Sequence, residues 1–357
     1  MCAKVAVAMS GGVDSSTAAW ILKQAGHDLI GVTMKLFDNG DVGVEGEISC
    51  CSLDDVEDAR AVARQLGFPF YVFNFSRQFH HQVMDRFACA YERGETPNPC
   101  IDCNRYLKFG ALLQRAKELD RDYVATGHYV RLSYDRGSGR WLLHKALHPE
   151  KDQSYVLYML TQAQLSHTQL PLGALHKTEV RAIAEEQSFY NAKKPDSQDI
   201  CFVPDGDYAT FIRRHTGKTD VPGDFTAESG KILGQHKGIT HYTVGQRKGL
   251  GVPSNEPLYV KAIDPARNRV VLSGNAALYS RTLTAGDLNW IAWDTPPRQF
   301  QCSAKTRYRQ TEQPCTVTVT AEGRAEVCFD MPQRAITPGQ AVVFYEGDTV
   351  LGGGTIL

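Results

Sequence analysis

The sequence lacks several features that would assign it to whole classes of protein. It has no run of eighteen apolar residues, so it predicts no membrane-spanning helix. It has no excess of one charge: Lys and Arg total 39, Asp and Glu total 40, and the formal net charge is −1. A surface that binds polyanions everywhere is therefore excluded, and any nucleic-acid site requires a local cluster of basic residues. No internal repeat and no low-complexity segment occur.

The composition is that of a folded chain, with 42% hydrophobic and 22% charged residues. A length of 357 residues predicts two or three domains. The first residues, MCAKVAVAMSGG, are typical of a buried strand and a glycine turn and not of a secretory signal. We therefore expect a cytoplasmic location.

Ten cysteines without a secretory signal favour catalytic or metal-linked thiols over a structural disulfide framework. Five of them are interpreted as small hydrophobic residues, namely Cys2, Cys89, Cys302, Cys315 and Cys328. The adjacent pair Cys50 and Cys51 receives no role.

The first half of the chain alternates strand and helix patterns. Strands are predicted at 5–9, 29–36, 70–75 and 123–126, and helices at 16–25, from a capping box at Ser52 and Asp55, at 79–92 and after Asn104. Repeated βα units predict an α/β fold with a doubly wound parallel sheet. From about Gly234, short β runs broken by Gly and Pro predict a small β module and then a β-barrel. The expected domains are 1–205, 206–274 and 275–357.

The turn Met9–Ser16 follows the first strand and opens a helix. Its glycines allow close approach of the backbone, and the N–H groups of the helix N-terminus attract phosphate. The hydroxyls of Ser10, Ser15 and Ser16 add donors, and the Asp14 carboxylate is a candidate ligand for Mg²⁺. It is not a Walker loop, because no Lys-Ser/Thr pair follows. An ordinary capped turn is the alternative, but the heptad SGGVDSS in this context resembles the PP-loop of ATP pyrophosphatases, which adenylate a substrate oxygen and release pyrophosphate.

Two cysteines lie in segments that favour reactivity. Cys103 follows the proline-rich run Thr96–Pro99 where a helix is expected to open, and a helix N-terminus lowers the pKa of a thiol. Cys201 lies in a loop after Lys193 and Lys194, which could also favour a thiolate. Two interpretations compete with reactivity: the cysteines pack in the core as small hydrophobic residues, or the pair Cys100-x-x-Cys103 forms half of a metal site.

The order of these motifs resembles the MnmA-type tRNA-specific 2-thiouridylases over nearly the whole chain. In chain order the motifs are Met9–Ser16, Thr96–Asn104, Ala125–Tyr129, Lys151–Tyr155, the loop around Cys201, and Thr243–Gly251. The resemblance implies ATP-dependent adenylation of the C2 oxygen of the wobble uridine in tRNA. Sulfur then comes from a cysteine persulfide that a donor protein supplies, and 2-thiouridine, AMP and pyrophosphate are formed.

Carried onto this chain, the resemblance implies that Cys201 receives the persulfide and that Cys103 attacks it, releasing sulfide or closing a transient disulfide. The implied ATP-binding residues are Ala8, Met9, Ser10, Gly11, Gly12, Val13, Asp14 and Ser15, with Met34 and Gly127 near the nucleoside. The implied contacts with the target base are Asn98, Pro99 and Cys100, and those with tRNA are His128, Lys151, Asp152, Gln153, Arg307, Tyr308 and Gln340. The alternative for His128 is a structural role. The alternative for Arg307 and Tyr308 is that they belong to a charged strand face.

One departure concerns Cys100, where many family members carry Asp, and Asp102 is a candidate replacement. The change creates Cys100-x-x-Cys103, so a minority hypothesis is a [4Fe-4S] cluster on Cys100, Cys103 and Cys201. Two alternative functions are another PP-loop ligase or amidotransferase that uses ammonia, and a non-enzymatic tRNA-binding iron–sulfur module. The sequence does not indicate which tRNAs are modified, which protein donates sulfur, or the oligomeric state.

Overall fold

The computed structural model describes residues 2–38, 40, 53–195 and 200–357. Three expectations fall outside that part of the chain: the capping residue Ser52, the pair Cys50 and Cys51, and the segment 196–199 that precedes Cys201. None of the helices in the described part is both long enough and apolar enough to cross a membrane.

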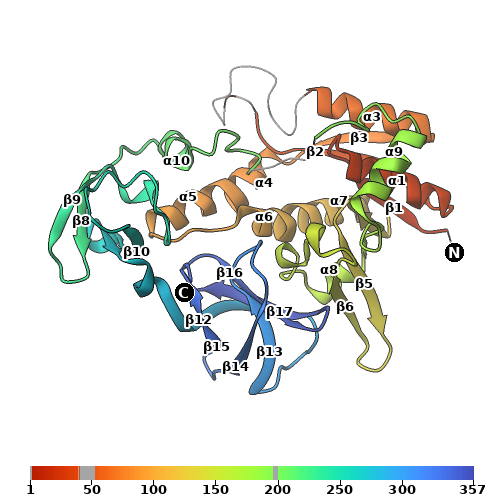
Figure 1. Ribbon diagram of the computed structural model, residues 1–357. Coiled ribbons are helices and arrows are strands. Elements are labelled where there is room, and N and C mark those ends of the chain that lie inside the picture. Colours follow the sequence, from red (N-terminus) through yellow and green to blue (C-terminus); the bar gives the residue numbers. More distant parts are fainter. Residues whose placement is uncertain (1, 39, 41–52, 196–199) are drawn as a thin grey trace.

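A five-stranded sheet forms the core of the N-terminal part, with the strand order β3-β2-β1-β4-β7 (Figure 1). All of its neighbouring strands are parallel. The strands are β1 (Lys4–Ala8), β2 (Asp28–Lys35), β3 (Phe70–Asn74), β4 (Tyr123–Ala125) and β7 (Thr168–Gln169). The first four confirm the strands predicted from the sequence.

Helices cover both faces of this sheet. Because side chains alternate along a strand, Val5 and Val7 of β1 join one hydrophobic cluster and Ala6 joins another. The first cluster holds α1 (Val13–Gln24), α3 (Leu53–Leu66) and α9 (Lys177–Glu186); the second holds residues of α4 (Ser76–Phe79), η1 (His80–Met84), α5 (Asp85–Glu92), α7 (Leu112–Glu118) and α10 (Tyr208–Thr216). The predicted doubly wound α/β fold is therefore confirmed.

The strand order predicts a ligand position beside β1. The chain runs outward from β1 to β2 and β3 on one side, and to β4 and β7 on the other. Ligands of open parallel sheets bind at such a switch point, beyond the carboxyl ends of the strands. The turn after β1 and the segment 126–128 after β4 both emerge there.

A long helical segment begins at Pro99 and not after Asn104. It comprises α6 (Pro99–Asp102), the π-helical η2 (Cys103–Ala111) and α7. The Asn98 side chain accepts a hydrogen bond from the Cys100 N–H at 3.1 Å, and Pro99 occupies the first helical position. The predicted start of this helix is therefore wrong, and Cys103 lies in its second turn.

The rest of the chain forms two β units. The first is a four-stranded sheet of order β10-β11-β8-β9, with β8 (Gly223–Ala227), β9 (Ile232–His236), β10 (Tyr259–Asp264) and β11 (Arg269–Ser273). Its β structure starts at Gly223, earlier than the predicted Gly234, and α10 precedes it. The second is a six-stranded barrel that pairing between β12 and β17 closes. Its strands are β12 (Tyr279–Trp290), β13 (Gln299–Lys305), β14 (Gln313–Val319), β15 (Ala325–Arg334), β16 (Ala341–Glu346) and β17 (Thr349–Ile356).

A hairpin that the sequence did not predict joins the N-terminal part, which contains the parallel sheet, to the barrel. Strands β5 (Val130–Asp135) and β6 (Arg140–Lys145) leave the parallel sheet after β4, and β6 pairs with β17 (Figure 1). Backbone hydrogen bonds between β6 and β17 thereby hold the barrel against the N-terminal part of the chain, in addition to side-chain contacts.

Candidate active site

The phosphate-binding turn between β1 and α1 has the backbone geometry of an anion site. Gly11 has a φ of 74°, and Gly12 caps α1 without contributing a side chain. The N–H groups of the first helical turn therefore meet no capping side chain. Ser15 and Ser16 both donate their hydroxyls to the Gly12 carbonyl, at 3.0 and 3.2 Å. Of the three serines proposed as donors, Ser10 is the exposed one.

Asn191 supports this turn from a distant part of the chain. Its amide donates to the Gly11 carbonyl at 2.8 Å and to the Ser16 hydroxyl at 2.9 Å. Its own oxygen is buried and has no hydrogen-bond partner among the described residues. Buried polar atoms are normally satisfied, so this oxygen is an exception in the support of the turn.

The Asp14 carboxylate is fixed by two donors. Its Oδ1 accepts hydrogen bonds from the Lys177 ammonium and from the Tyr129 hydroxyl, each at 2.6 Å. Lys177 is the first residue of α9, and Tyr129 follows β4. Three segments thus converge on the start of α1, and a carboxylate so restrained presents its other oxygen in a defined direction.

The loop after β4 lies against the start of α1. A Cβ on Gly127 would lie 2.8 Å from the Asp14 carbonyl carbon and 2.9 Å from the Ser15 nitrogen, so only glycine fits there. The neighbouring His128 is buried, and its Nδ1 lies 2.7 Å from the Thr126 hydroxyl. Burial holds the pKa of His128 well below its ordinary value, so the ring is neutral. Met34 is half-buried near the end of β2. It packs against the hydrophobic cluster that contains Ala6 and α5, on the opposite face of the sheet from α1.

The two candidate cysteines border one hydrophobic cluster. Cys103 is a member of it, and Cys201 packs against it. Because the helix begins at Pro99, the exposed Cys100 occupies its first turn, and the argument that a helix N-terminus activates Cys103 directly does not hold. Lys194 is also unsuited to favour a Cys201 thiolate, since its ammonium contacts Asp55 and Asp58 at 2.6 and 2.7 Å.

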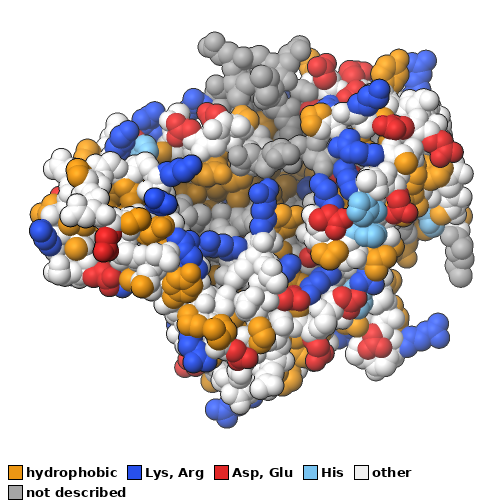
Figure 2. Space-filling model, in the orientation of Figure 1, with side chains coloured by type: hydrophobic (Ala, Val, Ile, Leu, Met, Phe, Trp, Pro, Cys, Tyr) orange, Lys and Arg blue, Asp and Glu red, His pale blue; other side chains and the backbone are white. Residues whose placement is uncertain are grey.

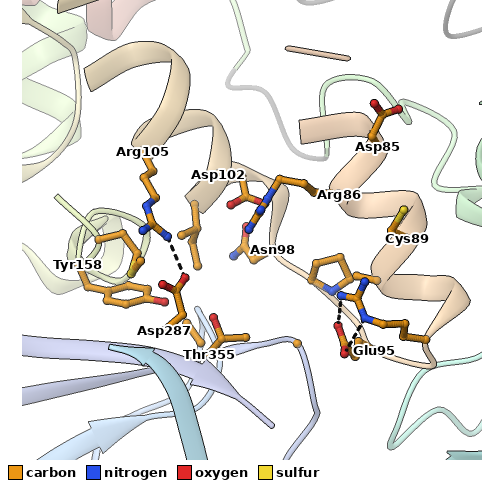
Figure 3. A pocket seen from close by; sticks show the side chains of 17 residues that line it. Asp85, Arg86, Cys89, Glu95, Asn98, Asp102, Arg105, Tyr158, Asp287 and Thr355 are labelled. Atoms are coloured by element: carbon orange, nitrogen blue, oxygen red, sulfur yellow. Dashed lines mark hydrogen bonds and ion pairs between the residues drawn. The ribbon is translucent and has the colours of Figure 1, made fainter. Parts of the chain in front are cut away.

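A cavity of about 270 Å³ lies between α5, α6 and the barrel (Figure 3). Asp102 lines it, 3.2 Å from the Arg86 guanidinium. Burial raises the pKa of Asp102, although Arg86 opposes the shift. On the barrel side, Arg105 of η2 bonds to Asp287 of β12 at 2.8 Å. Neither Cys103 nor Cys201 lines this cavity.

Comparisons with known proteins cover all three structural units. Residues 3–205 match the tRNA methyl transferase HUP domain, 209–274 the tRNA methyl transferase PRC-barrel domain and 280–356 the aminomethyltransferase beta-barrel domain. The tRNA-specific 2-thiouridylase MnmA of Clostridioides difficile is 50% identical over 99% of this chain and 98% of its own length. The MnmA of Moorella thermoacetica is 51% identical over 98% of both chains.

This chain belongs to the MnmA family of tRNA-specific 2-thiouridylases. Among solved structures, a 4-thiouridine synthetase bound to RNA and ATP is 19% identical, covers 57% of this chain and 45% of its own, and has a TM-score of 0.35. The identity of about half with the MnmA proteins over the full chain confirms the resemblance recognised in the sequence motifs.

The residues that the MnmA resemblance assigns to tRNA differ in exposure. Asp152 accepts hydrogen bonds from the N–H of Ala146 and the hydroxyl of Ser154, and Lys305 lies 3.7 Å away. Gln153 accepts from the Tyr129 N–H at 3.0 Å. Both side chains therefore hold the polypeptide in place, whereas the preceding Lys151 is half-exposed.

The barrel contributes both support and surface. Gln340 donates to the Thr96 carbonyl at 2.6 Å, and Arg307 donates to the carbonyls of Arg334 and Ala335. Tyr308 is 39% exposed; its pKa is raised by burial and, to a smaller extent, by the neighbouring Asp152 and Cys100. Tyr308 is therefore a partly exposed aromatic residue close to Asp152 and Cys100.

Figure 2 shows Lys and Arg side chains around the hollow in the middle of the molecule, although the net charge of the chain is −1. This local cluster is what a nucleic-acid site requires in a neutral protein. Sequence reasoning gave no site role to four residues that order the site, namely Asp55, Tyr129, Lys177 and Asn191, although Asp55 belongs to the predicted capping box and Tyr129 to the motif Ala125–Tyr129. Their contacts have no local signal, because each acts on a turn more than forty residues away.

Proposed function

We propose that this chain places sulfur at C2 of the wobble uridine of tRNA, as a tRNA-specific 2-thiouridylase. The observation that carries the proposal is its identity of about half with curated MnmA proteins over its full length. The glycine turn before α1 and the two cysteines at one cluster supply, respectively, the adenylation and the sulfur chemistry that the reaction needs.

The crevice at the end of β1 is the proposed ATP site. Backbone N–H groups at the turn would bind the phosphates, and the opening beside Gly127 and Met34 would take the nucleoside. The residues assigned to the phosphates are Ala8, Met9, Ser10, Gly11, Gly12, Val13, Asp14 and Ser15. Asp14 fits a magnesium ligand, because only its Oδ1 is held by Lys177 and Tyr129. Mg²⁺, when bound, neutralises phosphate charge and so favours departure of pyrophosphate.

The proposed sulfur step uses both cysteines. Adenylation turns the C2 oxygen of uridine into a good leaving group. The outer sulfur of a persulfide on Cys201, loaded by a donor protein, then bonds to C2 as AMP leaves. The Cys103 thiolate attacks the Cys201 sulfur, the S–S bond to the transferred sulfur breaks, and its electron pair stays with the product. The resulting Cys103–Cys201 disulfide requires reduction by a thiol. In the alternative order, Cys103 first releases sulfide, which attacks C2.

The proposed RNA contacts divide into two groups. Asn98, Pro99 and Cys100 lie at the start of the cysteine helix and would meet the target base, which must leave the anticodon stack to expose C2. Lys151, Arg307 and Tyr308 would contact backbone and bases by charge and stacking. We assign His128, Asp152, Gln153 and Gln340 to holding those surfaces in position, since they are hydrogen-bonded within the protein and, unlike Arg307, bring no positive charge for phosphate.

The iron–sulfur hypothesis for Cys100, Cys103 and Cys201 rests only on their spacing and identity. Anaerobic purification followed by iron analysis and a visible spectrum decides it. Colourless, iron-free protein that is fully active would eliminate the cluster.

The decisive experiment incubates the full chain with unmodified tRNA, ATP, Mg²⁺ and a sulfide source, and analyses the digested nucleosides by mass spectrometry. We expect a uridine product that has exchanged one oxygen for sulfur and that depends on both ATP and tRNA. Release of pyrophosphate without thiolated nucleoside, even with a persulfide donor present, would refute the sulfur chemistry and leave only adenylation.

A further inference from the structure

Three metal-binding side chains meet on the surface beside α9. The candidate ligand atoms of His148, Glu150 and His176 all lie within 4.8 Å of one another, and no other group of three or more His, Cys, Asp or Glu among the described residues does this. His148 and Glu150 flank Pro149 at the short helix η3 (Pro149–Lys151), and His176 caps α9. Two segments separated along the chain therefore supply one set of donors.

The His176 ring is already oriented toward its neighbours. Its Nδ1 lies 2.7 Å from the Thr178 hydroxyl and 3.3 Å from the Thr178 N–H, so its Nε2 points away from the helix. Nε2 lies 2.7 Å from a Glu150 oxygen. The His148 ring is edge-on to the His176 ring, and the two ring centroids are 4.7 Å apart. Metal-bound histidines are typically fixed by a hydrogen bond that their second ring nitrogen donates. Here Nδ1 accepts from the Thr178 N–H, and the adjacent Thr178 hydroxyl is an acceptor to which a protonated Nδ1 can donate instead.

We propose that His148, Glu150 and His176 bind one divalent transition-metal ion of the zinc class. Two imidazoles and one carboxylate suit Zn²⁺, Co²⁺ or Ni²⁺, whereas Mg²⁺ and Ca²⁺ prefer oxygen ligands. The ion replaces the Nε2 proton of His176 that faces Glu150, and that proton moves to Nδ1. Nδ1–H then donates to the Thr178 hydroxyl in place of the hydrogen bond that Nδ1 accepted from the Thr178 N–H. The Glu150 carboxylate offsets the positive end of α9, and a fourth coordination position remains for water.

Such an ion would connect two functional segments. Lys177, next to His176, holds Asp14 of the phosphate-binding turn, and Lys151 follows Glu150 directly. Metal binding would therefore fasten the segment that begins Lys151–Gln153 to the helix that restrains Asp14. This site does not depend on the proposed thiolation activity.

Cobalt titration of the reduced, chelator-treated full chain tests the proposal. We expect one equivalent of Co²⁺ to give visible d–d bands without a thiolate charge-transfer band, and Zn²⁺ to displace it. The absence of that band matters, because ten cysteines compete for these ions. Crystals soaked with Zn²⁺ should show an anomalous peak between His148 and His176.

The variants are His148→Asn, Glu150→Gln and His176→Asn, with His81→Asn as a control histidine that is exposed and paired with Asp85. Asn keeps the helix cap at position 176, so folding is preserved. Each of the three should weaken binding at least roughly tenfold, and the control should not. Absence of binding, a thiolate band, or an affinity that all three substitutions leave unchanged would overturn the site.

Discussion

The close approach of the phosphate-binding turn to α3 can be tested by substituting Gly11. A Cβ at this position would lie 2.3 Å from the Asp55 carbonyl oxygen and 2.8 Å from the Asp55 Cα, and the φ of Gly11 is 74°. Gly26 at the other end of α1 provides a matched control. Its φ is 79°, but nothing lies within 4 Å of a Cβ built there.

The two substitutions share one cost and differ in another. Alanine at positive φ costs about 1–2 kcal/mol at either position. Overpacking against rigid backbone adds about 1–3 kcal/mol, and this applies only to Gly11. We therefore expect Gly26→Ala to lower the free energy of unfolding by about 1–2 kcal/mol and Gly11→Ala by about 2–5 kcal/mol.

Urea unfolding followed by circular dichroism measures both free energies, and hydrogen exchange of the α1 amides locates the change. Pyrophosphate release with tRNA and ATP should fall in folded Gly11→Ala and stay near wild type in Gly26→Ala, because only the first displaces the turn. Equal destabilisation by the two substitutions would refute the reasoning, since α3 would then yield at no cost and Asp55 would not restrain the turn.

Three further predictions concern sulfur, RNA and pH. Cys103→Ser and Cys201→Ser should each abolish thiolation with tRNA affinity near normal, and strong residual activity in either would remove that residue from the mechanism. Arg307→Ala should weaken tRNA binding and lower its salt slope by about one, whereas Lys305→Ala should cost about 1–3 kcal/mol of stability by leaving the buried Asp152 carboxylate short of a partner; the reverse pattern would contradict the assignment of Arg307 to RNA. Since burial lowers the pKa of His128 below 6.5, the unfolded state binds more protons, and stability should fall as pH drops through that value. His128 contributes at most about 1.4 kcal/mol per pH unit to the slope of the unfolding free energy against pH, so this slope should be smaller in His128→Asn. Identical slopes for the two proteins in urea unfolding would disprove this role of His128.

The parallel sheet and the glycine turn between β1 and α1 could be predicted because their signals are local. Buried strands, the glycines after β1 and the helical spacing all lie within short windows. The start of the cysteine helix also had a local signal, since Asn98 and Pro99 are the preferred cap and first residue, but the prediction gave weight to Asn104 instead. That error transferred the argument about the helix N-terminus from Cys100 to Cys103.

Other parts of the site depend on contacts that no short window contains. Lys177 reaches Asp14 across 163 positions, and Lys194 reaches Asp55 across 139. The β5–β6 hairpin has an ordinary strand pattern, yet its partner β17 lies about two hundred residues later. Such pairings follow from the tertiary fold, so the sequence indicates which residue types are present but not which of them meet.

The barrel contacts the segment that leads into the cysteine helix. The Thr96 N–H donates to the Pro338 carbonyl at 2.8 Å, and the Thr96 carbonyl accepts from Gln340 at 2.6 Å. A Cβ on Gly339 would lie 2.9 Å from the Thr96 nitrogen, so the backbone segments around Gly339 and Thr96 are in close contact. Because Thr96 lies just ahead of the cysteine helix, displacing the barrel would break both hydrogen bonds and release the start of that helix. We therefore expect RNA that docks on the barrel to affect the position of Cys100 and Cys103 through this contact.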